Sequence, residues 1–166
     1  DLNRAFPGKK RGSFGEKFAR ELFDEFISKA DFGIDCHDAG SHHALLPHTR
    51  VSSCDDEDGE CLTQNLGRLF GAEVIIERSG KKGMMALEAY KRFGIPLVTI
   101  EIGGARHIYH DYLNEGVNGI LNILRFYKMI PGRVKMPRKQ FILHHRFGVK
   151  TPEAGIVEFK IKLGDK

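Results

Sequence analysis

Two apolar runs of this sequence end in side chains that can do chemistry. The first ends in Asp35, Cys36 and His37, and the two-residue period of a strand places Asp35 and His37 on one face. The second ends in Glu101, and a carboxylate at the end of a buried strand is costly unless it is paired, protonated or used. Histidine binds metals, and both side-chain types act as general acids or bases. Several hydrolase and metal-site functions fit these residues. Purely structural roles fit them as well: His37 as a hydrogen-bonded turn histidine and Glu101 as a salt-bridged glutamate.

Alternating helix and strand patterns position these two strand ends. Ser13 and Glu16 have the spacing of a capping box and predict a helix over 14–30. Its predicted buried stripe consists of Phe14, Phe18, Leu22, Phe26 and Ala30, widened by Phe23 and Ile27. The later patterns predict a strand at 31–37, a long loop at 38–56, a helix at 58–70, a strand at 74–77, a helix at 83–93, a strand at 97–102 and a helix at 113–124. This alternation is typical of an α/β fold whose mostly parallel sheet has helices on both faces. Ligands bind such sheets outside the carboxyl ends of the strands, where both chemical features lie.

Charge is unevenly distributed along the 166 residues. The net charge is +4, but the segment 116–152 has no Asp or Glu and eight Lys or Arg, so the remainder carries −4. From about residue 131 the sequence becomes basic and β-like, with alternation over 156–163, and we place a domain boundary there. Aromatic residues interleave with the cations, as in nucleic-acid-binding surfaces, but no RNA- or DNA-binding motif is present.

Composition also predicts a compartment. Three cysteines without a CxxC pair argue against a disulfide framework and for a reducing, cytoplasmic location. No apolar run approaches the roughly 18 residues of a membrane helix, and no signal peptide opens the chain. We therefore expect no membrane partner and no nucleic-acid partner.

Five sequence segments carry a family resemblance. They are DLNRAFPG at 1–8, GIDCHDAG at 33–40, LLPHTRV at 45–51, GIPLVTIEIGG at 94–104 and GVNGILNILRFYKMIPG at 116–132. The first resembles the DLNRxFPG signature of the succinylglutamate desuccinylase/aspartoacylase family, which are zinc deacylases related to the zinc carboxypeptidases. The other segments follow in the order and at the spacing of that family, over nearly the whole chain.

The resemblance implies a zinc-carboxypeptidase-like, three-layer α/β/α fold with a mostly parallel, mixed sheet, followed by the start of a small C-terminal β domain. It also implies that His37 is a zinc ligand, that Glu101 is the general base and acid, and that Asn3 and Arg4 bind the carboxylate of the substrate. Asp35 is placed to orient a zinc-bound imidazole from behind. The implied reaction is hydrolysis of an amide bond in a small N-acyl amino acid or related acyl amide, by a zinc-activated water that loses a proton to Glu101.

The same resemblance predicts which part of the family fold this chain holds. Residues 1–130 match the central and C-terminal part of the catalytic domain, and residues 131–166 match a linker and the truncated start of the small β domain. The family takes its other two zinc ligands from a His-x-x-Glu motif before DLNR. We therefore expect those ligands upstream of Asp1, and we expect the isolated 166-residue chain to be inactive.

Some alternatives stay open at the level of sequence. His42, His43 and His48 follow His37 closely and could bind a transition metal, line the rim of a pocket or contact substrate. A carboxypeptidase-like hydrolase of peptide or cell-wall substrates is the main alternative function, and a basic binding module for nucleic acid or an acidic partner is the other. The sequence leaves open the acyl group, the amine and the formation of a homo-oligomer.

Overall fold

The computed structural model describes residues 1–166 with the exception of 41–42, 53–60, 105–106 and 166. At its centre is a five-stranded sheet with the strand order β1-β4-β2-β3-β5. The strands are β1 (Gly33–His37), β2 (His48–Val51), β3 (Val74–Glu77), β4 (Leu97–Glu101) and β5 (Phe141–Leu143). Neighbouring strands are parallel except for the antiparallel pair β2 and β4, which confirms the predicted mostly parallel, mixed sheet.

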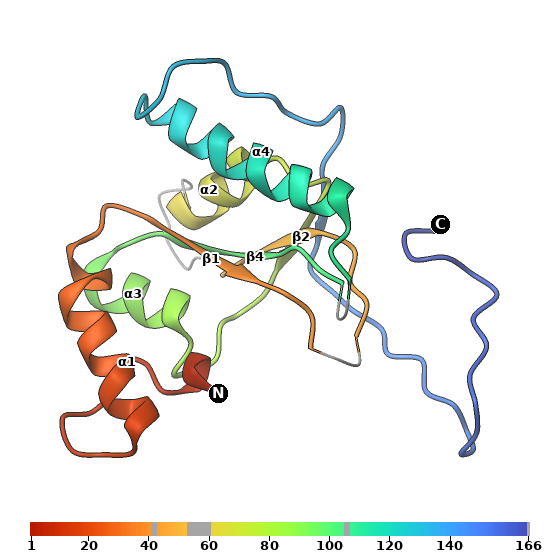
Figure 1. Ribbon diagram of the computed structural model, residues 1–166, viewed down its shortest axis with the longest axis horizontal. Helices are drawn as coiled ribbons and strands as arrows, with labels where there is room; N and C mark the ends of the chain where they lie inside the picture. The colour runs from red at the N-terminus through yellow and green to blue at the C-terminus, as the bar shows by residue number, and fades with distance from the viewer. Residues whose placement is uncertain (41–42, 53–60, 105–106, 166) are drawn as a thin grey trace.

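Helices cover both faces of this sheet. Figure 1 shows α1 (Phe14–Glu25) and α3 (Met85–Phe93) on one face, and α2 (Leu62–Phe70) and α4 (His110–Phe126) on the other. The three-layer α/β/α architecture is therefore confirmed. Each helical layer has its own apolar core, because the strands alternate their side chains between the two faces. The core on the side of α2 and α4 includes Leu66, Phe70, Ile100 and Ile123, and the core on the side of α1 and α3 includes Phe6, Ala19, Phe23 and Leu97.

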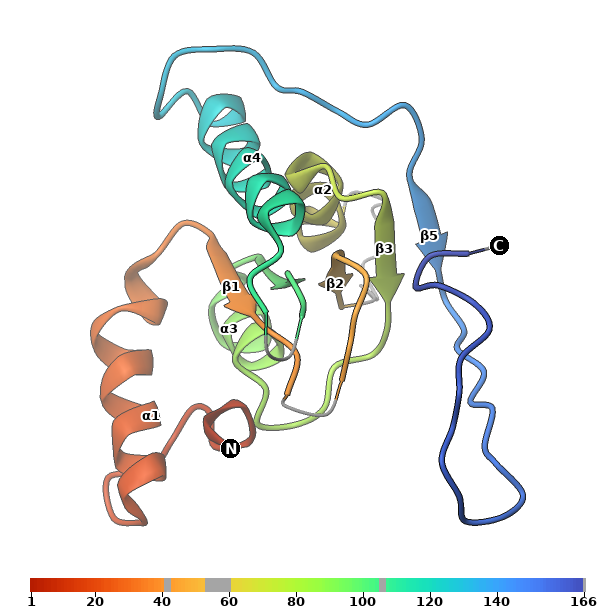
Figure 2. The same ribbon diagram turned by 45° about the vertical axis from the view of Figure 1, so that its right-hand side comes forward.

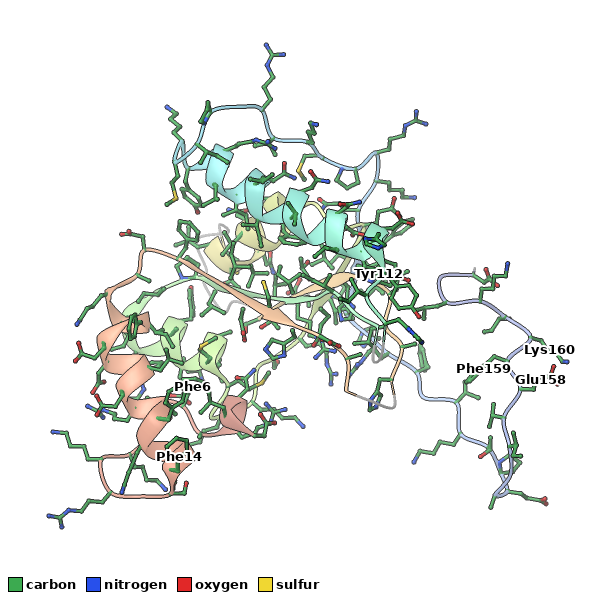
Figure 3. The ribbon with its side chains drawn as sticks, viewed as in Figure 1. Phe6, Phe14, Tyr112, Glu158, Phe159 and Lys160 are labelled. Carbon is green, nitrogen blue, oxygen red and sulfur yellow. The ribbon has the colours of Figure 1, made fainter. Side chains whose placement is uncertain are left out.

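Helix α1 buries only part of the predicted stripe. It ends at Glu25 rather than near residue 30, and a short 3-10 turn follows it. Ala19 and Phe23 face the core, whereas Phe14 is 85% exposed and stacks on Phe18 with ring centroids 6.2 Å apart. Figure 3 shows Phe14 near the start of α1. The prediction of burial was right for Phe23 and wrong for Phe14, Phe18 and Phe26. Aromatic residues on several sides of a helix do not reveal which side meets the sheet.

The capping box at the start of α1 is present as predicted. The backbone N–H of Glu16 donates to Ser13 Oγ at 3.4 Å, and the backbone N–H of Ser13 donates to Glu16 Oε2 at 2.9 Å. The side chain of Lys9 also bonds Glu16, and together with Ser13 it lowers the pKa of Glu16 from 4.5 to about 2. The helix therefore begins with two satisfied backbone donors and an ionised acid at its positive end.

Replacement of Ser13 by alanine is expected to lower the free energy of unfolding by about 1 kcal/mol, because the N-cap acceptor is lost. The folded pKa of Glu16 lies below its ordinary value, so its stabilising contribution is present above pH 4.5 and is lost as the pH falls toward about 2. Chemical denaturation at a series of pH values measures both effects. Glu16→Gln is expected to remove this pH dependence, and the same dependence in that variant as in the wild type would contradict the role of Glu16.

The segment 38–56, predicted as a long loop, contains strand β2. The prediction was wrong for His48–Val51, which pairs with β4 on one side and with β3 on the other. A four-residue strand gives a weak local signal, and here two neighbouring strands supply its hydrogen-bond partners. The predicted helix start at Asp58 lies outside the described residues, and the described part of α2 begins after an N-cap at Cys61.

Residues after 130 contribute to the sheet as well. Strand β5 runs parallel to β3 and lies beside it in Figure 2. The division of the chain into 1–130 and 131–166 stays a prediction. The described residues 144–165 form no strand, so the alternation over 156–163 was not a strand signal. Figure 3 shows Glu158, Phe159 and Lys160 on a segment that extends away from the sheet.

Cysteine pairing differs from the sequence-based expectation. Cys36 is a free thiol, but Cys61 is disulfide-bonded, so the expectation of reduced cysteines was wrong for Cys61. In the described part of the chain, the helices are too short or too polar to cross a lipid bilayer.

Candidate active site

A cavity of about 410 Å³ lies where β1 and β4 end. Asn3, Arg4, His37 and Glu101 all line it, although the chain separates the first from the last by almost a hundred residues. Parallel pairing of β1 with β4 sets His37 directly opposite Glu101, as expected for two strand ends at one edge of an α/β sheet. The structure therefore brings together four of the five residues predicted from the sequence.

Asp35, the fifth predicted residue, contacts the His37 ring but does not line the cavity. Its carboxylate Oδ2 is 2.8 Å from His37 Nε2, as the shared strand face predicts. This hydrogen bond raises the pKa of His37, and partial burial of the ring opposes the increase. Because Asp35 engages Nε2, the ring orientation is fixed and Nδ1 is left as the nitrogen that can bind a ligand.

Glu101 is a buried carboxylate in the centre of the site, with only 5% of the residue exposed. Its Oε1 forms an ion pair with the Nη1 of Arg50 at 2.9 Å. Burial lowers the pKa of Arg50, the charge of Glu101 opposes this, and the charges of Arg146 and Arg78 add to the lowering. Glu101 is thus a buried carboxylate with a cation beside it, and such a pair lowers the cost of burying the carboxylate.

His48 lies on the other side of Glu101 and holds Arg50. It is paired with Glu101 in the antiparallel register of β2 and β4, and it is buried rather than on the pocket rim. Its Nδ1 is 2.7 Å from the carbonyl oxygen of Leu46, and the Nε of Arg50 donates to its Nε2 at 3.2 Å. Burial lowers the pKa of His48, which agrees with a neutral ring that donates from Nδ1 and accepts at Nε2.

Asn3 uses part of its side chain to hold the fold. Its amide Oδ1 accepts a hydrogen bond of 2.8 Å from the backbone N–H of Met85, the first residue of α3. The backbone carbonyl of Asn3 also accepts from the guanidinium of Arg4. Figures 1 and 2 show the N-terminal turn beside the loop that leads into α3. Asn3 is therefore anchored to the start of α3, and Arg4 is bonded to Asn3.

Gly83 is required for this contact between the N-terminal turn and the loop before α3. Its φ of +87° is in the left-handed region, and a Cβ there would lie 2.3 Å from the carbonyl oxygen of Arg4. Its own carbonyl accepts a hydrogen bond from the backbone N–H of Phe6. A larger residue at this position has to push Arg4 out of place.

Substitution of Gly83 by alanine is expected to lower the free energy of unfolding by about 1–3 kcal/mol, with displacement of Arg4. Thermal or chemical denaturation measures the loss. Gly15→Ala is the matched control, because Gly15 lies in α1 with nothing within 4 Å of its added Cβ. Equal stability of the two variants would show that the close approach of Gly83 to Arg4 is not needed.

Cations dominate the cavity, and sequence analysis missed most of them. Apart from Arg4, the lining includes Arg50, Arg78, Lys81 and Arg146, whereas Asp1 and Glu101 are its only acidic members among the described residues. Arg146 belongs to the basic segment 116–152, for which the sequence left open a separate role in binding nucleic acid or an acidic partner. The HTR sequence of LLPHTRV has the two-residue period of a strand and could have revealed Arg50, but no local signal indicated Arg78 or Arg146.

The chemistry of the residues present fits part of a zinc site. Nδ1 of His37 suits zinc, and a carboxylate that orients the ring from behind is a common companion of a metal-bound imidazole. In the described part of the chain, no three His, Cys, Asp or Glu side chains are grouped to hold a metal ion. Both ring nitrogens of His48 have other partners, His43 is exposed, and His42 lies outside the described residues. His37 therefore fits as one ligand of a set that these residues do not complete.

Comparison with known proteins identifies the family of this chain. Residues 1–127 match the model of the succinylglutamate desuccinylase/aspartoacylase catalytic domain. The N-alpha-acetyl-L-2,4-diaminobutyric acid deacetylase of Halomonas elongata is 26% identical over 170 residues, which cover 99% of this chain and 50% of the relative. The chain thus spans about half the length of that curated relative.

Solved structures show the same fold. A succinylglutamate desuccinylase/aspartoacylase from Rhodobacter sphaeroides has 28% identity and a TM-score of 0.72, over 83% of this chain and 40% of that chain. A succinylglutamate desuccinylase from Silicibacter sp. TM1040 has 24% identity and a TM-score of 0.82, over 99% of this chain and 51% of that one. With residues 1–127 matched to its catalytic domain, this chain belongs to the succinylglutamate desuccinylase/aspartoacylase family of deacylases.

Proposed function

We propose that this chain provides part of a zinc-dependent hydrolase that cleaves the amide bond of a small N-acyl amino acid or a related acyl amide. The observation that carries the proposal is the single cavity that unites His37 and Glu101 with a wall of cations. A cavity of about 410 Å³ is of the size that encloses a small molecule. Its cationic lining favours a substrate with at least one carboxylate.

The roles of the residues follow from their chemistry. Glu101 accepts the proton of the water that attacks the amide carbonyl, and it returns the proton to the nitrogen as the C–N bond breaks. Arg4 binds the carboxylate of the substrate with its planar guanidinium, and Asn3 contributes its amide N–H groups. His37 binds zinc through Nδ1, with Asp35 behind it, and the two other ligands are expected upstream of residue 1. Bound zinc would acidify the water and polarise the carbonyl.

Zinc content and activity of the full-length protein test this proposal together. Hydrolysis of N-acetyl-L-2,4-diaminobutyrate, N-succinyl-glutamate and N-acetyl-aspartate is followed by release of the free amine, before and after removal of metal with a chelator. We expect hydrolysis of at least one of these amides, lost with the metal and restored by zinc. Hydrolysis that survives complete metal removal would contradict the zinc dependence, and a preference for peptides over all three amides would favour the carboxypeptidase-like alternative.

Replacement of His37 by alanine in the full-length protein is expected to abolish stoichiometric zinc binding, because it removes one of three ligands. Elemental analysis of the purified variant measures the zinc content. His110→Ala is the control, because His110 is an exposed residue at the start of α4 that does not line the cavity. Retention of one zinc per chain by the His37 variant would remove His37 from the ligand set.

Three further expectations belong to the same proposal. The substrate is the expected partner, with no nucleic acid and no membrane, and homo-oligomer formation stays open. A cytoplasmic location stays a prediction from the cysteine count.

A further inference from the structure

Arg50 makes two side-chain contacts with different parts of its guanidinium. Its Nη1 pairs with Glu101 Oε1 at 2.9 Å, and its Nε donates to His48 Nε2 at 3.2 Å. His48 is in turn bonded to the backbone carbonyl of Leu46 at 2.7 Å. Two hydrogen bonds and one ion pair therefore connect the backbone before β2 to the central carboxylate of the cavity.

The sheet register explains why Arg50 can reach Glu101. Arg50 pairs with Thr99 across β2 and β4, while His48 pairs with Glu101, so Arg50 is diagonal to Glu101 on the same face. The long arginine side chain spans this diagonal, and His48 lies on the same strand two residues before it. A lysine has no Nε–H to give to His48 while its single ammonium contacts Glu101.

We propose that Arg50 is a positioning residue for Glu101, held in place by His48. This inference rests on the proposed function, in which Glu101 moves the proton of the attacking water. Arg50 pairs with Oε1 of the carboxylate, and we assign Oε2 as the oxygen that accepts that proton. When Arg50 fixes the position of Oε1, it also fixes the position of Oε2 relative to the attacking water. Misplacement of a catalytic group by about 1 Å can lower the rate by about 10²-fold.

The contact itself is tested without any substrate. Arg50→Ala, Glu101→Gln and the double variant are made in the full-length protein, and the free energy of unfolding of each is measured. We expect the double variant to lose less stability than the sum of the two single losses, because Arg50→Ala leaves a buried carboxylate without its partner. Strictly additive losses would overturn the proposal, whatever the substrate of the protein is.

The positioning role is tested by kinetics on the acyl amide that the wild-type protein hydrolyses. Arg50→Ala is expected to lower kcat by about 10²-fold with little change in KM, because the substrate still binds. Arg50→Lys is expected to recover part of kcat, and added guanidinium ion is expected to restore part of kcat to Arg50→Ala. His48→Leu is expected to lower kcat less than Arg50→Ala, since it removes the support of Arg50 and leaves the ion pair.

Arg92→Ala is the matched control. Arg92 pairs with Glu88, another buried glutamate, at 3.1 Å, but neither residue lines the cavity. We expect this variant to lose stability and to keep its kcat. Three results would overturn the positioning role. The first is a change in KM rather than kcat for Arg50→Ala, and the second is a kcat that added guanidinium does not restore. The third is a loss of kcat no larger than that of Arg92→Ala. If the wild type hydrolyses none of the amides, the proposed function fails, and the stability measurements still decide whether Arg50 holds Glu101.

Discussion

Replacement of Glu101 by glutamine is expected to lower kcat for acyl amide hydrolysis by about 10²–10⁴-fold, which is the range for loss of a general base. Glutamine has the shape of glutamate and fits the same buried position, but its amide cannot accept and return a proton. Steady-state kinetics of the full-length variant measures the effect. KM is expected to change little, because Arg4 and the other cations still bind the substrate.

Glu88→Gln is the control for this substitution. Glu88 is buried to a similar degree on α3, accepts a hydrogen bond from the backbone N–H of Gly83, and does not line the cavity. Its glutamine variant keeps an acceptor oxygen and is expected to retain kcat. If Glu101→Gln kept more than a tenth of the wild-type kcat, Glu101 would not be the group that moves the proton.

Replacement of Phe23 by alanine is expected to lower the free energy of unfolding by about 3–5 kcal/mol. Phe23 is 1% exposed in the core between α1, α3 and the sheet, where its ring lies 6.1 Å from that of Phe6 and 5.6 Å from that of Phe93. Its removal leaves a cavity that the surrounding helices fill only in part. A loss of this size is a large fraction of the stability of a typical domain, which is about 5–15 kcal/mol. Chemical denaturation of the isolated chain measures it.

Phe14→Ala on the same helix is the control for Phe23. Phe14 is 85% exposed and contacts Phe18 rather than the core, so its removal is expected to change the free energy of unfolding by no more than about 0.5 kcal/mol. The two variants remove the same side chain from one helix and differ in burial. Similar losses at both positions would contradict the orientation of α1 in this structure.

The strands and helices with strong local patterns were predictable from the sequence. Val74–Glu77 was predicted with its observed ends, and the strands that end in His37 and Glu101 were placed to within a few residues. Strand β2 was missed because its four residues are held by neighbours on both sides, and such partners are distant in sequence. The buried face of α1 was predicted too broadly: Phe23 is buried as predicted, but Phe14, Phe18 and Phe26 are exposed. Aromatic residues occur on both sides of that helix, so the sequence does not reveal which of them meet the core.

The candidate site was predictable where its residues belong to recognisable motifs. Asp35 and His37 alternate on one strand, and their hydrogen bond follows from that local spacing. Asn3, Arg4 and Glu101 were identified through the family resemblance, and the cavity that contains them agrees with the identification. Their catalytic and binding roles stay predictions for the experiments above.

The sequence by itself determined the fold class, the family and the local pair of Asp35 and His37, because these depend on periodicity and on motifs of a few adjacent residues. Only the tertiary structure decided that Arg50 from β2 reaches Glu101, and that Arg78 and Arg146 line the same cavity. The physical reason is that an isolated arginine in a sequence favours no particular partner. The register of β2 against β4 sets the first contact, and the path of the chain after β5 brings Arg146 to the site.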